Sequence, residues 1–188
     1  MEEKLLRRFY LKEFKAISHA IATYEDLNVL ARHLAEGTAR SFSAKGCSIM
    51  LYDDREKQLF AVATYGISED YVRKGPIFVN RKDSAFARGE PVFVKDMQKD
   101  SRVQYPREAA REGIVSMISV PIKSRGAVVG TIRIYQSEAK EFHEDDIGAM
   151  GVLAELLGLV IENSGLRNFF EGVRGALESL PLRMLEGI

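Results

Sequence analysis

The sequence IVSMISVPIKSRGAVVGTIRIY occupies residues 114–135 and contains two apolar runs joined by a short loop at residues 123–126. Runs rich in β-branched residues on either side of a glycine-containing loop predict an antiparallel β-hairpin. Because side chains alternate along a strand, one face carries Ile118, Val120, Ile122, Val128, Ile132 and Ile134. The other face, called the mixed face, carries Met117, Ser119, Val129, Thr131, Arg133 and Tyr135. A solvated face would alternate with charged residues, so the mixed face predicts a second, more polar covered space.

The size and charge of the chain exclude several classes of function. Its 188 residues suffice for one domain with its own core. Acidic and basic residues balance at 27 each, so no overall field favours nucleic acid or an anionic membrane. The single Cys47 excludes an internal disulfide and a cysteine-based metal cluster, and the histidines lack the spacing of a local metal motif. No apolar run approaches the length of a membrane span. We expect a cytoplasmic protein without a metal, nucleic-acid partner or membrane partner.

The chain before the hairpin divides into two helical and two extended stretches. Apolar residues recur at helical spacing over residues 3–23, which predicts an amphipathic helix, and again over residues 27–41. Short apolar runs at residues 47–52 and 59–64 flank a charged turn, which predicts two strands.

Residues 65–112 break this regular pattern. Glycines and prolines divide the segment into short pieces, among them a predicted helix at residues 84–88, a strand at 92–94 and a helix at 106–112. A loop region this long in a compact domain is usually functional or disordered, and its apolar content argues against disorder. We interpret residues 73–113 as a lid over the mixed face, with Phe86, Phe93 and Tyr105 helping to close a pocket.

The C-terminal part is predicted to be helical, with one interruption. A strong helical stripe begins near Ile147, the run Asn163-Ser164-Gly165 interrupts it, and the spacing resumes from Leu166 to Leu180 as a second or kinked helix. This gives an N-terminal helix at residues 1–25, a central domain at 26–164, and a C-terminal helix and tail at 165–188.

In their order and spacing, several fragments resemble the GAF domain family, which occurs in bacterial sensors and cyclic-nucleotide phosphodiesterases. They are CSIMLYDD with LFAVATYG, then GEPVFVKDMQKDSRV, then GIVSMISVPI with GAVVGTIRIY, and finally FHEDDIGAMGVLAELLGLVIENS. The resemblance implies a PAS-related α+β fold with a central antiparallel sheet of five or six strands. It also implies terminal helices on one face of the sheet and a ligand pocket under a lid on the other.

Departures from the family's patterns narrow the function that the resemblance implies. The chain has neither the signature of the cyclic-nucleotide-binding members nor the cysteine–histidine pair of bilin-attaching members. We therefore expect a non-catalytic sensor that binds an unidentified small molecule, with no cofactor or catalytic residue assigned. One alternative is a structural dimerisation or protein-interaction module whose pocket is filled. A more remote alternative is a thiol-redox enzyme resembling free methionine sulfoxide reductase, which needs two thiols where this chain has only Cys47. Beside Ile49 and Leu51, Cys47 is best interpreted as a buried hydrophobe.

Two arginines are the charged candidates for ligand contact. Arg133 is expected to point into a partly buried space, where a charge needs a partner or a ligand anion. Arg102 lies in a loop with Asp96 and Asp100, which favours a role in loop architecture, although a cation beside a helix start could bind a carboxylate or phosphate. The full set of predicted ligand contacts is Tyr52, Phe86, Phe93, Arg102, Tyr105, Met117, Ser119, Thr131 and Arg133.

The outer helices predict a homodimer. The helices near residues 27–41 and 147–161 are expected to cover the one sheet face that shelters helices. The apolar stripes of the two outer helices would then remain exposed, and contiguous exposed apolar surface marks interfaces. We predict a two-fold dimer built from residues 3–21 and 166–180, with a signalling protein as a further candidate partner. The residues expected at this interface are Leu5, Phe9, Phe14, Phe169, Phe170, Val173 and Leu177.

Overall fold

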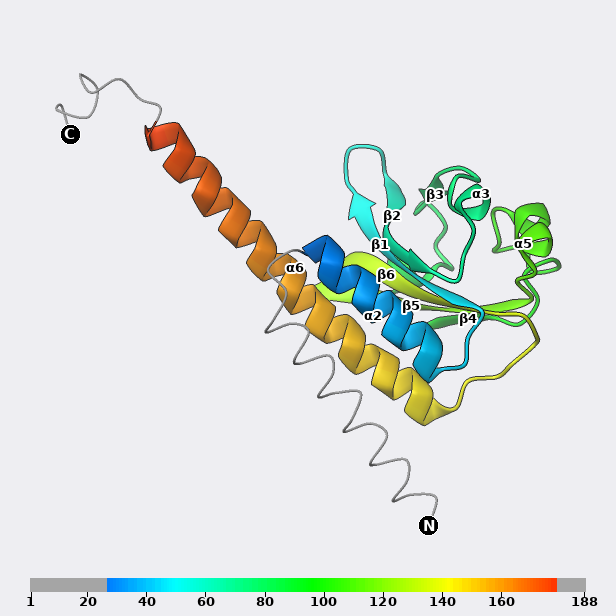
Figure 1. Cartoon of the computed structure of the whole chain (residues 1–188). Coiled ribbons are helices and arrows are strands. Elements are labelled where there is room, and N and C mark those ends of the chain that lie inside the picture. Colours follow the sequence, from blue (N-terminus) through cyan, green and yellow to red (C-terminus); the bar gives the residue numbers. More distant parts are fainter. Residues whose placement is uncertain (1–26, 179–188) are drawn as a thin grey trace, which may run out of the picture.

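The computed structural model describes residues 27–178 and has an α+β fold built on one six-stranded antiparallel sheet (Figure 1). The strand order is β3-β2-β1-β6-β5-β4, with every neighbouring pair antiparallel. The strands are β1 (Gly46–Asp53), β2 (Gln58–Tyr65), β3 (Ile77–Phe78), β4 (Val92–Val94), β5 (Ser116–Ser124) and β6 (Ala127–Gln136). The helices are α2 (Leu27–Ser41), α3 (Glu69–Val72), α4 (Ala85–Arg88), α5 (Pro106–Glu112) and α6 (Glu144–Glu178).

One face of the sheet is covered by two long helices. Helices α2 and α6 lie side by side across it, whereas α3 and α5 lie on the opposite side (Figure 1). The aliphatic face of the β5–β6 hairpin packs under the long helices, as the alternation predicts. Cys47 and Ile49 of β1 join the same core. The hairpin residues in this core are Ile118, Val120, Ile122, Ile132 and Ile134.

The β5–β6 hairpin contains a bulge that strict alternation did not predict. Ile122 pairs with Gly130 and Lys123 pairs with Val128, so Val129 has no partner in the ladder. Val129 packs against the helix-side core, whereas Val128 lies beside Gly89 at the end of α4. The assignment of Val128 to the aliphatic face and Val129 to the mixed face was therefore wrong. One extra residue in a strand moves the side chains beyond it to the opposite face of the sheet.

Helix α6 is continuous across the predicted interruption at residues 163–165. A glycine inside a helix lowers the stability of the helix by about 1 kcal/mol relative to alanine. Helix α6 nevertheless continues without a break over 35 residues. Residues 144–165 are also long and apolar enough to span a membrane, which corrects the expectation that no apolar run reaches such a length. In this structure Met150, Leu153 and Leu157 of that stretch pack in the core on the sheet.

The short elements of the lid have well-formed ends. The Ser84 hydroxyl accepts a hydrogen bond from the Ala87 amide at the start of α4, and Gly89 ends the helix in a left-handed conformation. Helix α5 begins with Pro106 and ends at Gly113, which is also left-handed. The predicted helices at 84–88 and 106–112 and the strand at 92–94 are confirmed, whereas α3 and β3 were not predicted.

Candidate functional site

A small cavity of about 70 Å³ lies between the mixed face and the lid, and is called the inner cavity here. Its floor is formed by Met117 and Ser119 of β5 and Arg133 of β6, and its walls come mainly from residues 71–105. The interpretation of residues 73–113 as a lid over this face is therefore confirmed. The predicted ligand contacts that line the inner cavity are Phe86, Arg102, Tyr105, Met117, Ser119 and Arg133.

The other predicted contacts lie elsewhere. Phe93 was wrongly placed in the pocket: Val92 and Val94 line the cavity, so strand alternation turns Phe93 to the helix-side core, where its ring lies 6.0 Å from that of Phe142. Tyr52 packs against Phe86, with ring centroids 4.6 Å apart, but does not line the cavity. Thr131 is also outside the lining, fully buried within the sheet.

Hydrogen bonds hold the lid together across its length. The Tyr105 hydroxyl donates to the Pro76 carbonyl at 2.8 Å. The Gln104 amide pairs with the backbone of Phe78, donating to its carbonyl at 2.8 Å and accepting from its N–H at 3.2 Å. These contacts join the start of the lid to the loop before α5, so the wall of the inner cavity is one connected structure.

Arg102 lines the inner cavity, but its charge is already paired. Its Nε donates to Asp100 Oδ1 at 2.9 Å, and its terminal nitrogen donates to the Phe93 carbonyl at 2.9 Å. The hydrogen bonds that Arg102 donates to Asp100 raise the pKa of Arg102 and hold the pKa of Asp100 below its usual value. Arg102 therefore ties the lid to β4, in agreement with a role in loop architecture.

Lys74 is a site residue that sequence reasoning missed. It lines the inner cavity from the link between α3 and β3, donates to the Tyr71 carbonyl at 2.9 Å, and lies 3.9 Å from the centroid of the Tyr71 ring. Burial, followed by the nearby positive charge of Arg133, lowers the pKa of Lys74 to about 8. A lysine beside Gly75-Pro76 carries no sequence signal of burial, because most such lysines are solvated.

Arg133 is another cation on the cavity wall. Its Nε is buried and has no hydrogen-bond partner within the described residues. Tyr135 follows on the same face of β6, where its hydroxyl forms a 3.0 Å hydrogen bond with Ser48. Burial raises the pKa of Tyr135 and the charge of Arg133 opposes that rise. Neither Lys74 nor Arg133 takes part in an ion pair in the part of the chain that the structure describes.

A second, larger hollow of about 350 Å³ lies beside the inner cavity and is called the outer groove. It is bordered by residues of β1 and β2 and by residues 71–77. Both hollows are lined by Leu59, Tyr71, Lys74 and Ile77, so these four side chains form the wall between them.

Thr131→Val is expected to stabilise the fold. Thr131 is 1% exposed, and its hydroxyl has no hydrogen-bond partner within residues 27–178. An unsatisfied buried polar group costs about 1–3 kcal/mol, and valine has nearly the same shape. We expect chemical denaturation to show a gain of about 1 kcal/mol in the free energy of unfolding. Thr64→Val, at a half-buried position on β2, is the control and should change it little. A loss of stability in Thr131→Val would mean that the hydroxyl has a partner.

The thiol of Cys47 is buried, and its surroundings make it unreactive. It is fully enclosed in the helix-side core, and burial raises its pKa to about 12. Reactive thiols are exposed and have a lowered pKa. Within residues 27–178, no group of three histidine, cysteine, aspartate or glutamate side chains could hold a metal ion.

The comparison with protein families identifies the class of this chain. The GAF domain model matches residues 25–162, and the chain belongs to the GAF domain family. A sensor associated with methyl sulfide methyltransferase in Methanosarcina acetivorans is 29% identical over 124 residues. The match covers 62% of this chain but 12% of that sensor, so the chain spans a small part of its relative's length.

Solved structures show the same fold at low identity. The GAF domain of a phosphoenolpyruvate-protein phosphotransferase from Coxiella burnetii is 20% identical with a TM-score of 0.75, covering 85% of this chain and 96% of that one. Free methionine-R-sulfoxide reductase from Neisseria meningitidis, solved with its substrate, is 22% identical with a TM-score of 0.70, covering 84% and 91%. The fold is therefore shared by the GAF domain of a phosphotransferase and by a methionine sulfoxide reductase.

Proposed function

We propose that this chain is a non-catalytic sensory domain that binds a small molecule in the inner cavity and transmits the bound state through α6. The observation that carries the proposal is the cavity itself, which the lid closes over the floor formed by Met117, Ser119 and Arg133. Concave sites lined by apolar side chains with a few convergent polar groups are the usual form of small-molecule sites. Sensory roles are typical of GAF domains, and the relative from Methanosarcina acetivorans is named as a sensor.

Catalysis by a thiol is a poor fit to the same geometry. Cys47 lies among helix-side core residues, whereas the inner cavity lies on the opposite face of the sheet. A nucleophilic thiol must reach its substrate and ionise, and burial of Cys47 opposes both. The likeness to a methionine sulfoxide reductase concerns the fold, and the proposed role remains a sensory one in the cytoplasm.

We propose further that two copies of the chain associate through α6. The C-terminal half of the helix extends beyond the sheet (Figure 1). Val152 and Leu159, two turns apart on α6, are 48% and 64% exposed, and Phe170 further along the helix is 66% exposed. Exposed apolar residues along one helix are typical of helical interfaces, with two-fold symmetry the commonest arrangement. Of the residues expected at the interface, Leu5, Phe9 and Phe14 lie outside the described residues, as do the side chains of Phe169, Val173 and Leu177.

Native mass spectrometry of the freshly purified protein tests the ligand proposal. We expect a mass excess that is lost on denaturation, and we expect Ser119→Leu, which fills the floor of the inner cavity, to abolish it. Ser101→Leu changes an exposed position of the lid outside the lining and is the control. If the unmodified protein carries no added mass and Ser119→Leu also melts at a higher temperature, the domain is a structural module with an unused cavity.

A further inference from the structure

Of the four cationic side chains that line the inner cavity, Lys74 and Arg133 form no ion pair within residues 27–178, whereas Arg81 and Arg102 are paired with Asp83 and Asp100. Lys74 reaches the cavity from the lid and Arg133 from β6, and the positive charge of Arg133 disfavours the charged form of Lys74 by repulsion. The carboxylates nearest to Lys74 belong to α5, and Glu112 among them is occupied by Ser68, which donates to it through both its N–H and its hydroxyl. A charge taken out of water is costly unless it is paired. The ligand-free protein therefore holds a destabilising positive charge on the cavity wall.

The space available limits the size of the group that could neutralise this charge. A cavity of about 70 Å³ has room for about five to seven non-hydrogen atoms, since a water-sized group needs about 10–15 Å³ of such space. The lining also contains an apolar part, formed by Val92, Val94 and Met97, and its other two arginines, Arg81 and Arg102, are already paired with Asp83 and Asp100. A phosphate presents three or four oxygens that all need donors, whereas a carboxylate presents two oxygens and can place a short alkyl group against the apolar wall.

We infer that the molecule sensed in the inner cavity is a short-chain carboxylate, with its two oxygens between Lys74 and Arg133 and its alkyl end against Val92, Val94 and Met97. This inference rests on the proposed sensory function and names its ligand class. Lys74 also stands in the wall shared with the outer groove, so the anion enters from the groove past the Lys74 side chain. A longer carboxylate would extend into the groove.

The inferred contact makes binding depend on pH in a definite direction. A carboxylate binds the protonated form of Lys74, whose pKa in the ligand-free protein is about 8. Affinity is therefore highest between the ordinary carboxyl pKa of about 4, below which the ligand is protonated, and the pKa of Lys74, and above the latter it falls towards the affinity of Lys74→Met. The charged and titratable groups that bear on Lys74 are Tyr71 of α3, Tyr105, Glu108 and Glu112 of α5, and Arg133 of β6.

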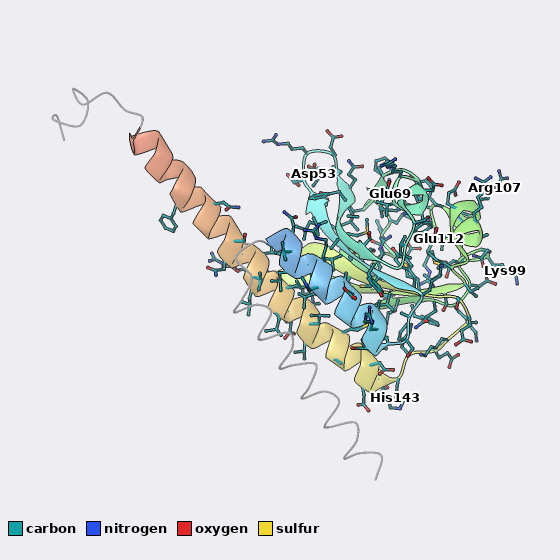
Figure 2. The ribbon with its side chains drawn as sticks, viewed as in Figure 1. Asp53, Glu69, Lys99, Arg107, Glu112 and His143 are labelled. Carbon is teal, nitrogen blue, oxygen red and sulfur yellow. The ribbon has the colours of Figure 1, made fainter. Side chains whose placement is uncertain are left out.

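The test titrates sodium acetate, propionate and butyrate against the full chain at constant ionic strength, beside the corresponding neutral amides. Thermal melting and calorimetry at pH 7 should show saturable binding of at least one carboxylate and none of its amide. Lys74→Met and Arg133→Met should each weaken that binding by about tenfold or more. Lys99→Met and Arg107→Met are matched controls, because both side chains point outward at the edge of the domain (Figure 2).

A second readout separates ligand contact from a structural role. Because Lys74 is desolvated and repelled by Arg133, ligand-free Lys74→Met should melt at a higher temperature than the unmodified protein. A lysine that held the lid in place would give the opposite result. Arg133→Glu should also abolish carboxylate binding, since it supplies an anion beside Lys74 within the fold.

Several results would overturn the inference. These are equal binding of a carboxylate and its amide, unchanged affinity in both methionine variants, absence of binding by every carboxylate, or a lower melting temperature in ligand-free Lys74→Met. A neutral co-purifying molecule retained by Lys74→Met would overturn the ligand class and leave the sensory function standing. If native mass spectrometry shows only the unliganded mass and no carboxylate binds, both the ligand class and the sensory function are contradicted.

Discussion

Gly158→Ala is expected to lower the free energy of unfolding by about 3 kcal/mol, at the upper end of the range for overpacked cores. At Gly158 the backbone of α6 closely approaches the backbone of β5. A Cβ added there would lie 1.8 Å from the Lys123 carbonyl oxygen. The obstacle is backbone at the end of a paired strand, so it cannot rotate away as a side chain would. The whole helix must retreat from the sheet, which loosens the packing of its neighbours Ala154, Leu157 and Ile161.

Gly151→Ala is the matched control for this substitution. It lies two turns earlier on the same helix, and its added Cβ would meet nothing within 4 Å. Alanine is a better helix former than glycine, so this variant should gain about 0.5–1 kcal/mol. Urea denaturation of both variants measures the difference. Equal stability of Gly158→Ala and the unmodified protein would show that α6 does not approach the sheet this closely.

Leu159→Glu is expected to weaken dimerisation about a hundredfold or more. The proposed interface places Leu159 in an apolar seam on the outer face of α6, where it is 64% exposed in one copy. An unpaired charge buried in such a seam costs about 3 kcal/mol or more, which corresponds to that change in the dissociation constant. Sedimentation at micromolar concentrations should show a dimer for the unmodified protein and a monomer for the variant.

Phe60→Glu provides the control for the dimer. Phe60 is an apolar residue with 45% exposure that lies on β2, and so on a different element from the proposed seam on α6. The same change in charge there should leave the dimer intact. A monomeric unmodified protein, or a Leu159→Glu variant that stays dimeric, would contradict an interface on the outer face of α6.

The sequence by itself determined the sheet and its two faces. Alternation in residues 116–122 and 130–135 separates the aliphatic residues from the mixed face, and the structure places them accordingly. Local signals also located the ends of α4 and α5, because a glycine after a short helix favours the left-handed conformation that ends it. These features depend on residues close together in the chain, so the sequence pattern contains the information that specifies them.

Only the tertiary structure decided what surrounds the cavity. The side to which Phe93 points follows from the register of β4 on β5, and the exchange of Val128 and Val129 follows from a bulge. Asp100 and the Phe93 carbonyl satisfy Arg102, whereas Lys74 is brought from the lid to Arg133 on β6 without a partner carboxylate. Residues 74 and 133 are far apart in the sequence, and their mutual repulsion arises only when the lid folds over the sheet. The charge on the cavity wall is therefore a property of the folded chain.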